Sequence, residues 1–396
     1  MIAPEPFFEP RGTPFSEYHR IRALTDLGHT VDLVTYPFGS DVSLPNLRVF
    51  RCLRPPFVRR VRIGPSWAKV ALDIALGFTA LRRVLATRYD VIHSHEEGAA
   101  IGILLARFTR RPHLYDMHSS LPQQLENFSF SRSRVLKSLF SWLERRVILR
   151  SRVIIVICPH LAETVRGISP SAEPILIENA PGSGDSPSAG SGARIRSEFG
   201  LAANTPLVVY TGTFEAYQGL ALLFSAAARV KQVRPDVRFL LAGGHPDQVA
   251  AARVLAREAG VEAETIFAGE RPAREIPLFL DAADVLVSPR STGTNTPLKI
   301  YQYLRAGRPI VATRLLTHTQ VLSDEVAVLT EPTPAGLAAG LLEAITNEAH
   351  AALVGRSARE LAERKYSYAA YVERTRQAVS ALEDAEPVAA PAGGVS

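Results

Sequence analysis

Short apolar runs alternate along the chain with longer segments in which apolar residues recur every three or four positions. The short runs have the length of buried parallel strands, and the longer segments have the spacing of amphipathic helices. This alternation is typical of an α/β fold in which helices cover a parallel sheet. The strands expected in the first half are Val31–Tyr36, Val91–His95, His113–Met117, Val153–Cys158 and Pro174–Glu178.

Two segments of the first half, residues 67–85 and 136–147, have apolar side chains on one helical face. Packing against the core is one interpretation of both faces. Contact with a membrane surface is the other, because a helix that lies on lipid combines such a face with basic residues. The basic residues beside the second face are Arg145, Arg146 and Arg150.

The first strand of the chain is expected to be unusual. Met1, Ile2 and Ala3 precede Pro4, which leaves a segment that is short for a buried parallel strand. Either this strand is stunted or the native start lies upstream of Met1, and the sequence leaves both possibilities open.

A segment rich in Gly, Ser and Pro, residues 181–193, has the composition of a flexible linker and is expected to join two domains. Regular alternation resumes after it. The strands expected there are Leu207–Thr211, Val237–Ala242, Thr265–Ala268, Val285–Ser288 and Pro309–Thr313. The helices expected there are Ala221–Gln232, Gln248–Ala259, Pro297–Ala306, Pro334–Asn347 and Tyr368–Leu382.

The expected organisation is two Rossmann-like domains, at residues 1–180 and 194–366. A C-terminal helix is expected at 367–384, and a disordered tail rich in Ala, Pro and Gly at 385–396. Open α/β sheets bind ligands at the carboxyl ends of their strands, so we expect the site in a cleft between the two domains.

Composition excludes several classes of protein. The 396 residues are enough for two domains, and 46% hydrophobic with 21% charged residues is typical of a globular chain. Cys52 and Cys158 form neither a zinc spacing nor a disulfide framework, which fits a reducing compartment. There is no apolar run of membrane-spanning length and no pattern of a secretion signal. We therefore expect a cytoplasmic protein.

Basic residues are concentrated in the first half of the chain. Residues 1–180 contain 24 Lys and Arg against 16 Asp and Glu, whereas the remaining residues contain 21 against 23. This asymmetry indicates an anionic partner for the first half, such as phospholipid head groups, a lipid phosphate or nucleic acid. Nucleic acid is the weakest of these, because the aromatic residues are not interleaved with the arginines as a stacking platform requires.

The most informative stretch is 288–313. A strand ends at Ser288, a polar loop follows, and a helix is expected to begin near Pro297, a residue suited to a first helical turn. The free amide groups and positive end of that helix form a site for phosphate. Lys299 adds a positive charge, and Gln302 can bond ribose hydroxyls. An ordinary strand–helix–strand unit with a solvated loop explains the same pattern.

In this stretch the chain resembles glycosyltransferase family 4, whose members have the GT-B fold. Residues 297–313 are similar to the donor-binding helix and following strand of that family. Further matching segments occur in the expected order over residues 1–382, and they include Gly28–Val31, Asp90–His95, Tyr115–His118, Ile177–Asn179, Tyr210–Thr213, Leu240–Gly244 and Ala282–Val285.

The resemblance implies a retaining transferase that uses a UDP- or GDP-sugar and needs no further cofactor. It implies that His118 is the catalytic residue that contacts the transferred sugar, and that Glu96 contacts the acceptor. Gly12, in the loop 10–14, can let the first strand's turn approach the donor phosphates. The residues expected to bind the donor are Gly12, Thr213, Glu215, Gln218, Gly243, Arg271, Thr294, Asn295, Thr296, Pro297, Leu298, Lys299 and Gln302.

The chain departs from the family pattern at the donor site. The family commonly has two glutamates eight positions apart, and here those positions are Thr294 and Gln302. The Arg and Lys that often hold the diphosphate are also replaced, because no basic residue occurs between Arg196 and Arg229. Donor phosphates are therefore expected to depend on the helix start, on Lys299 and on backbone amides.

These observations predict transfer of a sugar from a nucleotide donor to an acceptor that is lipid-linked or part of a surface glycan. Retention is expected because the acceptor attacks the face of the sugar from which the phosphate leaves. The leaving phosphate oxygen then takes the acceptor's proton. The absence of an Asp-x-Asp triplet predicts no metal requirement. Peripheral contact with anionic lipid on the inner face of the plasma membrane would fit the basic first half. The alternatives are a non-catalytic sugar-nucleotide-binding subunit and a GT-B epimerase, the latter lacking the expected cleft carboxylates.

Overall fold

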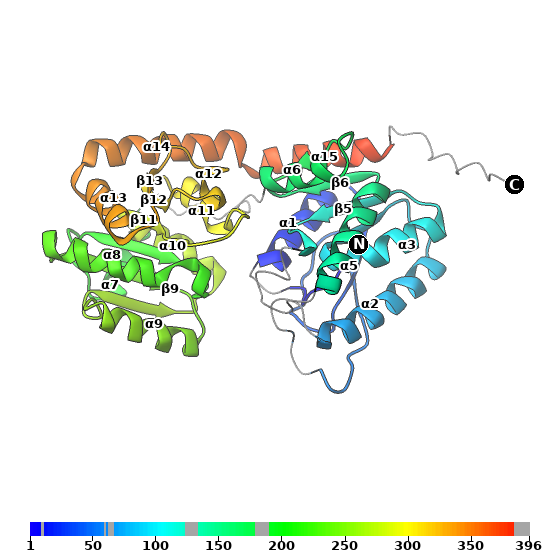
Figure 1. Ribbon diagram of the computed structural model, residues 1–396, viewed down its shortest axis with the longest axis horizontal. Helices are drawn as coiled ribbons and strands as arrows, with labels where there is room; N and C mark the ends of the chain where they lie inside the picture. The colour runs from blue at the N-terminus through cyan, green and yellow to red at the C-terminus, as the bar shows by residue number, and fades with distance from the viewer. Residues whose placement is uncertain (9–11, 59–60, 62–66, 123–133, 179–189, 384–396) are drawn as a thin grey trace, which may run out of the picture. The chain divides into compact units, whose positions relative to one another are not determined.

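The computed structural model describes residues 1–8, 12–58, 61, 67–122, 134–178 and 190–383 (Figure 1). The chain divides into two compact units. Unit 1 consists of Met1–Glu178 with the C-terminal segment from Tyr371, and unit 2 consists of Asn179–Ala370. The cleft expected between the two domains stays a prediction.

The described part of unit 1 contains a seven-stranded parallel sheet in the order β3-β2-β1-β4-β5-β6-β7. The short strand β1 pairs with both β2 and β4, so the segment expected to be stunted is in the middle of the sheet. The strands are β1 (Ile2–Ala3), β2 (Val31–Thr35), β3 (Leu47–Arg51), β4 (Ile92–His95), β5 (His113–Met117), β6 (Val153–Val156) and β7 (Ile175–Leu176).

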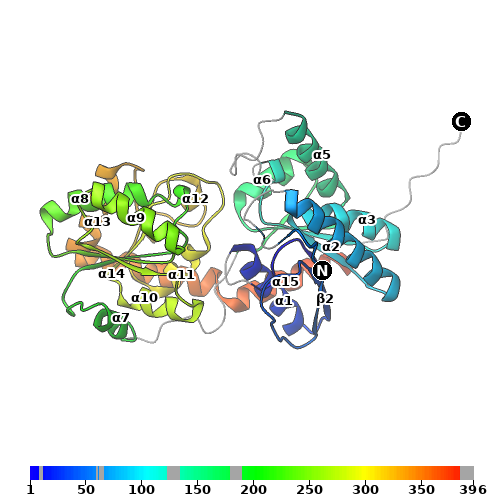
Figure 2. The ribbon, with the colours of Figure 1, turned by 90° about the horizontal axis from the view of Figure 1, so that it is seen from below.

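Helices cover both faces of this sheet. Apolar side chains of α2, α3, α5 and α6 pack on one face, and those of α1 and α15 pack on the other (Figure 2). Connections that move along the sheet in one direction place their helices on one face, because βαβ crossovers are right-handed. The helices are α1 (Gly12–Asp26), α2 (Trp67–Ala86), α3 (Ala99–Thr109), α5 (Arg134–Arg150), α6 (Pro159–Ile168) and α15 (Tyr368–Glu383).

Core packing does not explain the apolar face predicted on α2. Leu72, Leu76 and Ala80 are the buried residues of this helix, whereas Ile74 is 71% exposed and Phe78 is 58% exposed. The helix therefore has one apolar face against the sheet and a second that is exposed in the described structure. The core-packing interpretation is therefore wrong for this second face. Spacing of three and four positions shows that apolar residues share one side of a helix, but it does not show whether that side faces the strands.

Unit 2 has the same architecture, with a six-stranded parallel sheet in the order β10-β9-β8-β11-β12-β13. The described helices α8, α9 and α13 pack on one face, and α7, α10, α11 and α14 on the other. The strands are β8 (Leu207–Thr211), β9 (Arg238–Ala242), β10 (Thr265–Gly269), β11 (Val285–Ser288), β12 (Ile310–Thr313) and β13 (Val328–Thr330). The helices are α7 (Ala193–Glu198), α8 (Leu220–Val233), α9 (Pro246–Glu258), α10 (Ile276–Ala282), α11 (Leu298–Ala306), α12 (Leu316–Thr319), α13 (Pro334–Thr346) and α14 (Glu348–Lys365).

The strands expected from the sequence are present, and the differences lie elsewhere. The elements that were not expected include helices α1, α3, α6 and α14 and strands β3 and β13. Helix α11 begins one residue later than expected, with Pro297 as its N-cap. Most of the expected linker and the whole expected tail, 385–396, lie outside the described residues. No helix in the described part of the chain is long and apolar enough to cross a bilayer.

Candidate functional site

The sheet of unit 2 reverses its strand order between β8 and β11. Loops that leave the carboxyl ends of these strands are adjacent, and such reversals are where open α/β sheets bind ligands. The loop after β11 runs to Pro297, where α11 starts. No side chain of the described residues caps this start. The Ile300 amide donates to the Pro297 carbonyl oxygen at 3.0 Å, so the amide hydrogens of Leu298 and Lys299 remain for an anionic acceptor.

Lys299 is in the first turn of α11, close to the loop after β8. Its Nζ lies 3.2 Å from Gln218 Oε1 and 3.8 Å from the centre of the Tyr210 ring. A Cβ atom on Gly212 would lie 3.0 Å from the same Nζ. Burial, assisted by the charge of Arg290, lowers the pKa of Lys299 well below its usual value. An anion next to Nζ would favour the charged lysine again.

Gly243 lets the loops after β8 and β9 approach each other closely. Its φ is +132°, and a Cβ atom at this position would lie 1.9 Å from the carbonyl oxygen of Gly212. Only glycine fits such an approach without moving the backbone. The donor contact predicted at Gly243 would therefore be made by the backbone atoms of this residue.

Arg290 follows β11 directly and organises the loop before α11. Its Nη1 donates to the carbonyl oxygen of Asn295 at 2.7 Å and to Thr317 Oγ1 at 2.8 Å. Its guanidinium lies 4.9 Å from the centre of the Tyr217 ring. Arg290 Nε and Thr296 Oγ1 are buried and have no hydrogen-bond partner in the described structure. Two polar atoms near the start of α11 are thus left for a ligand.

The other predicted donor residues are distributed over the same edge of the sheet. Thr213 uses its carbonyl oxygen to accept from Tyr210 Oη at 2.7 Å, and Glu215 accepts from Gln248 at 2.9 Å. Thr294 uses its carbonyl oxygen to accept from the Gln320 side chain. Gln302 follows Lys299 by three positions on α11, so both side chains lie on one side of that helix. Leu298 is the first residue of the helix.

Two predicted donor residues lie apart from this group. Arg271 follows β10, which β9 separates from β8, and its guanidinium pairs with Glu198 at 2.7 Å. Gly12 belongs to unit 1, where it begins α1 with a φ of +48° and is exposed. Part of the loop 10–14 lies outside the described residues. The donor-binding roles of Arg271 and Gly12 stay predictions.

The sheet of unit 1 reverses its strand order between β1 and β4. Glu96 directly follows β4, and His118 directly follows the neighbouring strand β5. His118 Nε2 lies 3.3 Å from Asp116 Oδ1 and 3.3 Å from His95 Nδ1. The ring of the predicted catalytic residue is therefore oriented by groups at the ends of the same two strands.

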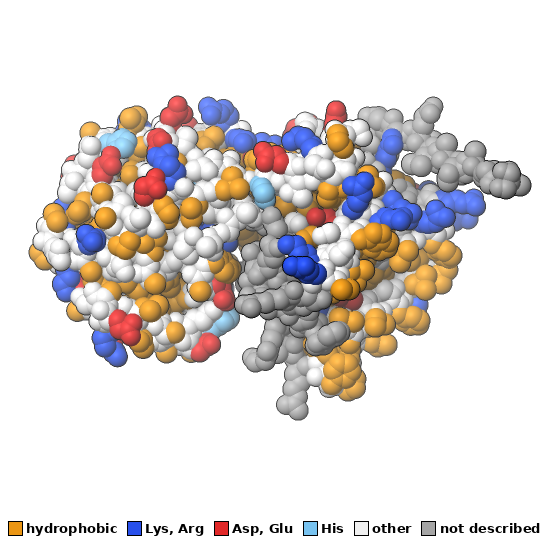
Figure 3. Space-filling view, viewed as in Figure 1, with side chains coloured by type: hydrophobic (Ala, Val, Ile, Leu, Met, Phe, Trp, Pro, Cys, Tyr) orange, Lys and Arg blue, Asp and Glu red, His pale blue; other side chains and the backbone are white. Residues whose placement is uncertain are grey.

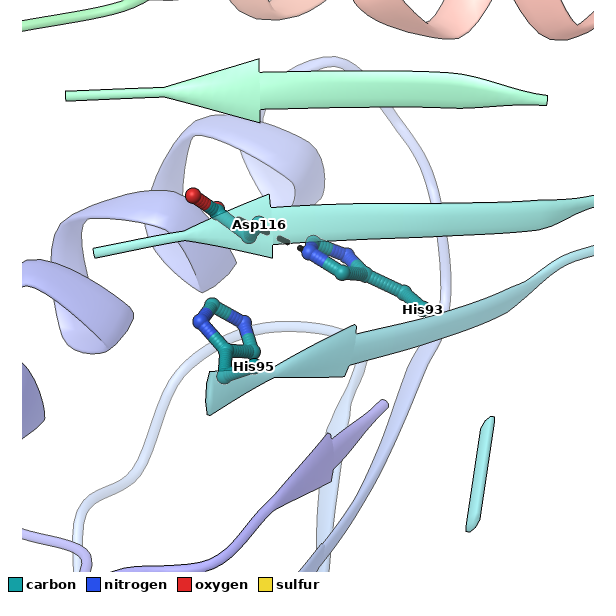
Figure 4. A group of neighbouring side chains, drawn as sticks. All are labelled: His93, His95 and Asp116. Atoms are coloured by element: carbon teal, nitrogen blue, oxygen red, sulfur yellow. Dashed lines mark ion pairs between the residues drawn. The ribbon is translucent and has the colours of Figure 1, made fainter. Parts of the chain in front are cut away.

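Asp116 is the centre of this buried cluster (Figure 4). Arg20 Nε from α1 lies 2.8 Å from its Oδ2, and His93 Nε2 lies 3.6 Å from the same oxygen. Burial alone would raise the pKa of Asp116, but the charges of Arg20 and His118 lower it well below its usual value. Asp116 is thus an ionised hydrogen-bond acceptor that can hold the His118 ring in one orientation.

Glu96 has the opposite electrostatic environment. Burial raises its pKa to about 8, and Ser119 Oγ donates to its Oε2 at 2.8 Å. Burial and the charge of Glu5 also raise the pKa of Glu17 well above its usual value. A carboxylic acid that stays protonated near neutral pH can donate a hydrogen bond to a hydroxyl oxygen.

Three residues of the described structure bring donor atoms together as metal ligands do. Atoms of His93, His95 and Asp116 lie within 4.8 Å of one another, and all three residues are buried (Figure 4). Arg20 already compensates the charge of Asp116. A cation at this carboxylate would be repelled by the guanidinium. The group therefore fits a hydrogen-bonded network better than a metal site.

Two family descriptions match the chain. The description "Glycosyl transferase 4-like domain" matches residues 18–180, in unit 1, and "Glycosyl transferases group 1" matches residues 205–347, in unit 2. The chain belongs to glycosyltransferase family 4. The resemblance expected from the sequence is thus confirmed, and this family 4 glycosyltransferase is an α/β protein of the GT-B fold.

Curated relatives of this glycosyltransferase resemble it over most of its length. Phosphatidyl-myo-inositol mannosyltransferase of Mycobacterium tuberculosis is 26% identical over 364 residues, which cover 88% of this chain and 87% of the relative. 2-Deoxystreptamine glucosyltransferase of Streptomyces kanamyceticus is 26% identical over 319 residues, which cover 74% of this chain and 78% of the relative.

Solved structures share the fold of this glycosyltransferase. Sucrose-phosphate synthase from Thermosynechococcus elongatus has a TM-score of 0.78 and 19% identity, covering 94% of each chain. The Anabaena protein HepE, solved in complex with UDP-glucose, has a TM-score of 0.75 and 17% identity, covering 95% of this chain and 98% of its own.

Sequence reasoning missed several side chains that organise the two edges. Arg290 carried a usable signal, because it is a single basic residue directly after a strand in the loop that reaches α11. Asp116 stands two positions before His118, within the motif that identified that histidine. Arg20 carried no such signal, because it is on a helix that the apolar pattern did not predict.

Proposed function

We propose that this glycosyltransferase moves a sugar from a UDP- or GDP-sugar to an acceptor hydroxyl, with retention of configuration at the sugar carbon and without a metal ion. The observation that carries this proposal is the uncapped start of α11, where Lys299 is buried and two polar atoms have no partner. The solved complex of HepE with UDP-glucose supports a nucleotide sugar as the donor.

In this proposal, unit 2 holds the departing diphosphate. Negative charge develops on that group as the bond to the sugar breaks, and preorganised donors lower the barrier. The amide groups at the start of α11 and the Lys299 ammonium supply these donors, and Gln302 bonds the ribose. Because Lys299 is buried, its interaction with the diphosphate is stronger than the same contact in water.

Unit 1 then supplies the groups that contact the transferred sugar and the acceptor. His118, oriented by Asp116, bonds a hydroxyl of the sugar. Glu96 donates its proton as a hydrogen bond to the acceptor. The leaving phosphate oxygen takes the acceptor's proton, so no protein base is needed for retention. The buried acid is thus a hydrogen-bond donor in this scheme and does not attack the sugar.

The names of the relatives suggest the acceptor chemistry. They refer to phosphatidyl-myo-inositol, D-inositol 3-phosphate and 2-deoxystreptamine, which share a six-membered carbon ring bearing hydroxyl groups. We include such a ring, free or linked to lipid, with the surface glycans among the acceptors. A reaction on the cytoplasmic side of the membrane fits these acceptors.

The donor proposal is tested with a thermal-shift panel of nucleotides and sugar nucleotides. We expect a nucleoside diphosphate to raise the melting temperature, and Lys299→Ala to lose most of that rise. Lys231→Ala is the matched control, because Lys231 lies on α8 and pairs with Glu264 at 2.8 Å. An equal rise in Lys299→Ala and wild type would show that the diphosphate is bound elsewhere.

A non-catalytic subunit that binds sugar nucleotides is the second candidate, because Thr294 occupies a position where the family commonly has a glutamate. The two functions differ in turnover. Hydrolysis or transfer of the matched donor by the purified chain would exclude the second candidate, and proton NMR of the product would test retention. Nucleotide binding without turnover across the acceptor panel would favour it.

A further inference from the structure

Unit 1 exposes apolar side chains on three neighbouring helices. Among the described residues, 19 large apolar side chains are exposed, and 11 of them belong to α2, α3 and α5. These helices lie side by side on one face of the sheet. The exposed side chains are Val70, Ile74, Phe78, Leu81 and Leu85 on α2, Leu104 and Phe108 on α3, and Val135, Leu139, Trp142 and Leu149 on α5.

The spacing of these side chains gives α2 a continuous apolar side away from the core, which α3 and α5 extend with fewer residues. On α2 the five residues follow each other at intervals of three or four positions, which is the repeat of one helical face. The space-filling view shows apolar side chains gathered over α2 and α3, with Lys and Arg beside them (Figure 3). A contiguous exposed apolar surface on three elements marks an interaction site. We call these residues the α2–α3–α5 face.

The exposed charged residues of the three helices themselves have one sign. None of the three helices carries an exposed Asp or Glu, since Glu144 is buried and accepts from the Leu121 amide, and Asp73 accepts from Tyr36 Oη. The exposed basic residues on these helices and directly after α3 are Arg82, Arg107, Arg110, Arg111, Arg134, Lys137, Arg145, Arg146 and Arg150. The partner of this face is therefore anionic as well as apolar.

We propose that the α2–α3–α5 face binds the surface of an anionic lipid bilayer. Apolar side chains would enter the head-group region, and the arginines would contact lipid phosphates. Trp142 is 53% exposed and lies 5.2 Å from the Arg146 guanidinium, a combination suited to the boundary between lipid and water. This inference goes beyond the proposed sugar transfer and does not depend on it.

A second copy of the chain fits the same face less well. A two-fold interface places the same surface on both subunits. The arginines of α5 would then meet the same three helices of the second copy, which carry no exposed carboxylate to compensate them. Nucleic acid is also disfavoured, because eight of the eleven exposed apolar side chains are aliphatic. A bilayer containing acidic lipid satisfies both the apolar and the basic residues.

Vesicle flotation tests the proposal, with phosphatidylcholine vesicles prepared with and without phosphatidylglycerol. We expect wild-type protein to float with the phosphatidylglycerol vesicles and to be released at about 1 M salt, where charges are screened beyond about 3 Å. The double variant Ile74→Ser with Phe78→Ser should bind about tenfold more weakly, because it removes two inserted side chains. Arg145→Gln with Arg146→Gln should weaken binding to a similar extent.

The matched control is Val254→Ser with Leu353→Ser, two exposed apolar residues of unit 2 on α9 and α14. This control should bind vesicles as wild type does. For every variant, the melting temperature without nucleotide reports folding, and the rise in melting temperature with nucleotide reports the donor site. In Trp67→Phe, Trp142 is the single tryptophan left, and its emission should shift to shorter wavelength on vesicles.

Two results would overturn the proposal. One is that wild-type protein binds phosphatidylglycerol vesicles at low salt no more tightly than the Ile74→Ser, Phe78→Ser variant, or does not bind them at all. The other is a wild-type dimer in light scattering that this variant converts to a monomer without any vesicle binding. That second result would assign the face to another copy of the chain.

Discussion

The two units present different chemistry at the same position of the same architecture. Both sheets reverse their strand order once and carry polar residues where the strands end. In unit 2 those residues are the cations Lys299 and Arg290 at an uncapped helix start. In unit 1 they are carboxyl groups and histidines around Asp116. Burial lowers the pKa of the lysine and raises that of Glu96, so each edge is closer to neutral than its composition suggests. The fold supplies the position, and the side chains determine the chemistry of each edge, which we propose suits phosphate in unit 2 and sugar hydroxyls in unit 1.

The largest expected effect is on turnover, and it comes from a substitution at the edge of unit 1. His118→Ala should lower kcat for transfer by on the order of 10²-fold to 10³-fold, as loss of a hydrogen-bond donor to a transition state commonly does. It should leave the thermal shift by nucleoside diphosphate unchanged, because His118 belongs to unit 1. Asp116→Asn should give a smaller loss of kcat, since the ring loses its orientation and not its contact. Equal kcat for wild type and His118→Ala would end the assignment of His118.

The next effect tests the close approach of two loops in unit 2. Gly243→Ala should destabilise the protein by about 2–4 kcal/mol, because the new methyl group would meet the Gly212 carbonyl and the backbone would be strained. Gly260→Ala is the control, since its φ is +72° but no atom lies within 4 Å of the added Cβ. Urea denaturation of both variants measures the difference. Similar losses at the two positions would mean that the β8 loop has room to move.

A smaller effect concerns the protonated acid of unit 1. Glu96 has a pKa of about 8 in the folded protein and 4.5 as its reference value. Between these values the folded state binds more protons than the unfolded state, so this group makes stability fall as pH rises from about 4.5 to about 8. Glu96→Gln should remove that part of the fall. Denaturation midpoints at pH 5 and pH 8 measure it, and an unchanged difference would show that Glu96 is ionised throughout.

The smallest effect is a proton taken up when the donor binds. Lys299 has a pKa well below its usual value in the free protein, and an adjacent diphosphate raises it again. Calorimetry of nucleoside diphosphate binding at several pH values, in buffers of different ionisation enthalpy, should therefore show proton uptake. Lys299→Gln is the control and should show less uptake. Uptake that is the same in wild type and variant would place the titrating group elsewhere.

The sequence predicted the sheets better than it predicted the sites. Strands such as Val285–Ser288 were predicted at their observed bounds, because a buried parallel strand is a short apolar run with recognisable ends. Strand β3 (Leu47–Arg51) was missed because its residues are only partly buried and carry arginines at both ends of a short apolar pattern. Helix α1 was missed because buried polar residues such as Glu17 and Arg20 interrupt its apolar face.

Contacts between distant parts of the chain explain what remained hidden at the site. Lys299 was predicted from its place in a helix start, and its burial next to Tyr210 depends on a strand 89 positions earlier. The surroundings of Asp116 depend on Arg20, which is 96 positions away. A one-dimensional pattern identifies a residue by its neighbours in sequence. It contains no information on which helix will place a guanidinium beside a carboxylate.

Unit 1 is discontinuous in the sequence, and this has a consequence for how the protein is made. Arg20 donates to Thr375 at 2.9 Å and lies 4.8 Å from the centre of the Tyr371 ring, both on α15. During synthesis on the ribosome these two residues emerge only after all of unit 2. Unit 2 can therefore complete its folding first, while the surroundings of Asp116 await the last helix. A nascent chain that has released unit 2 but not α15 would carry a finished unit 2 and an unfinished unit 1.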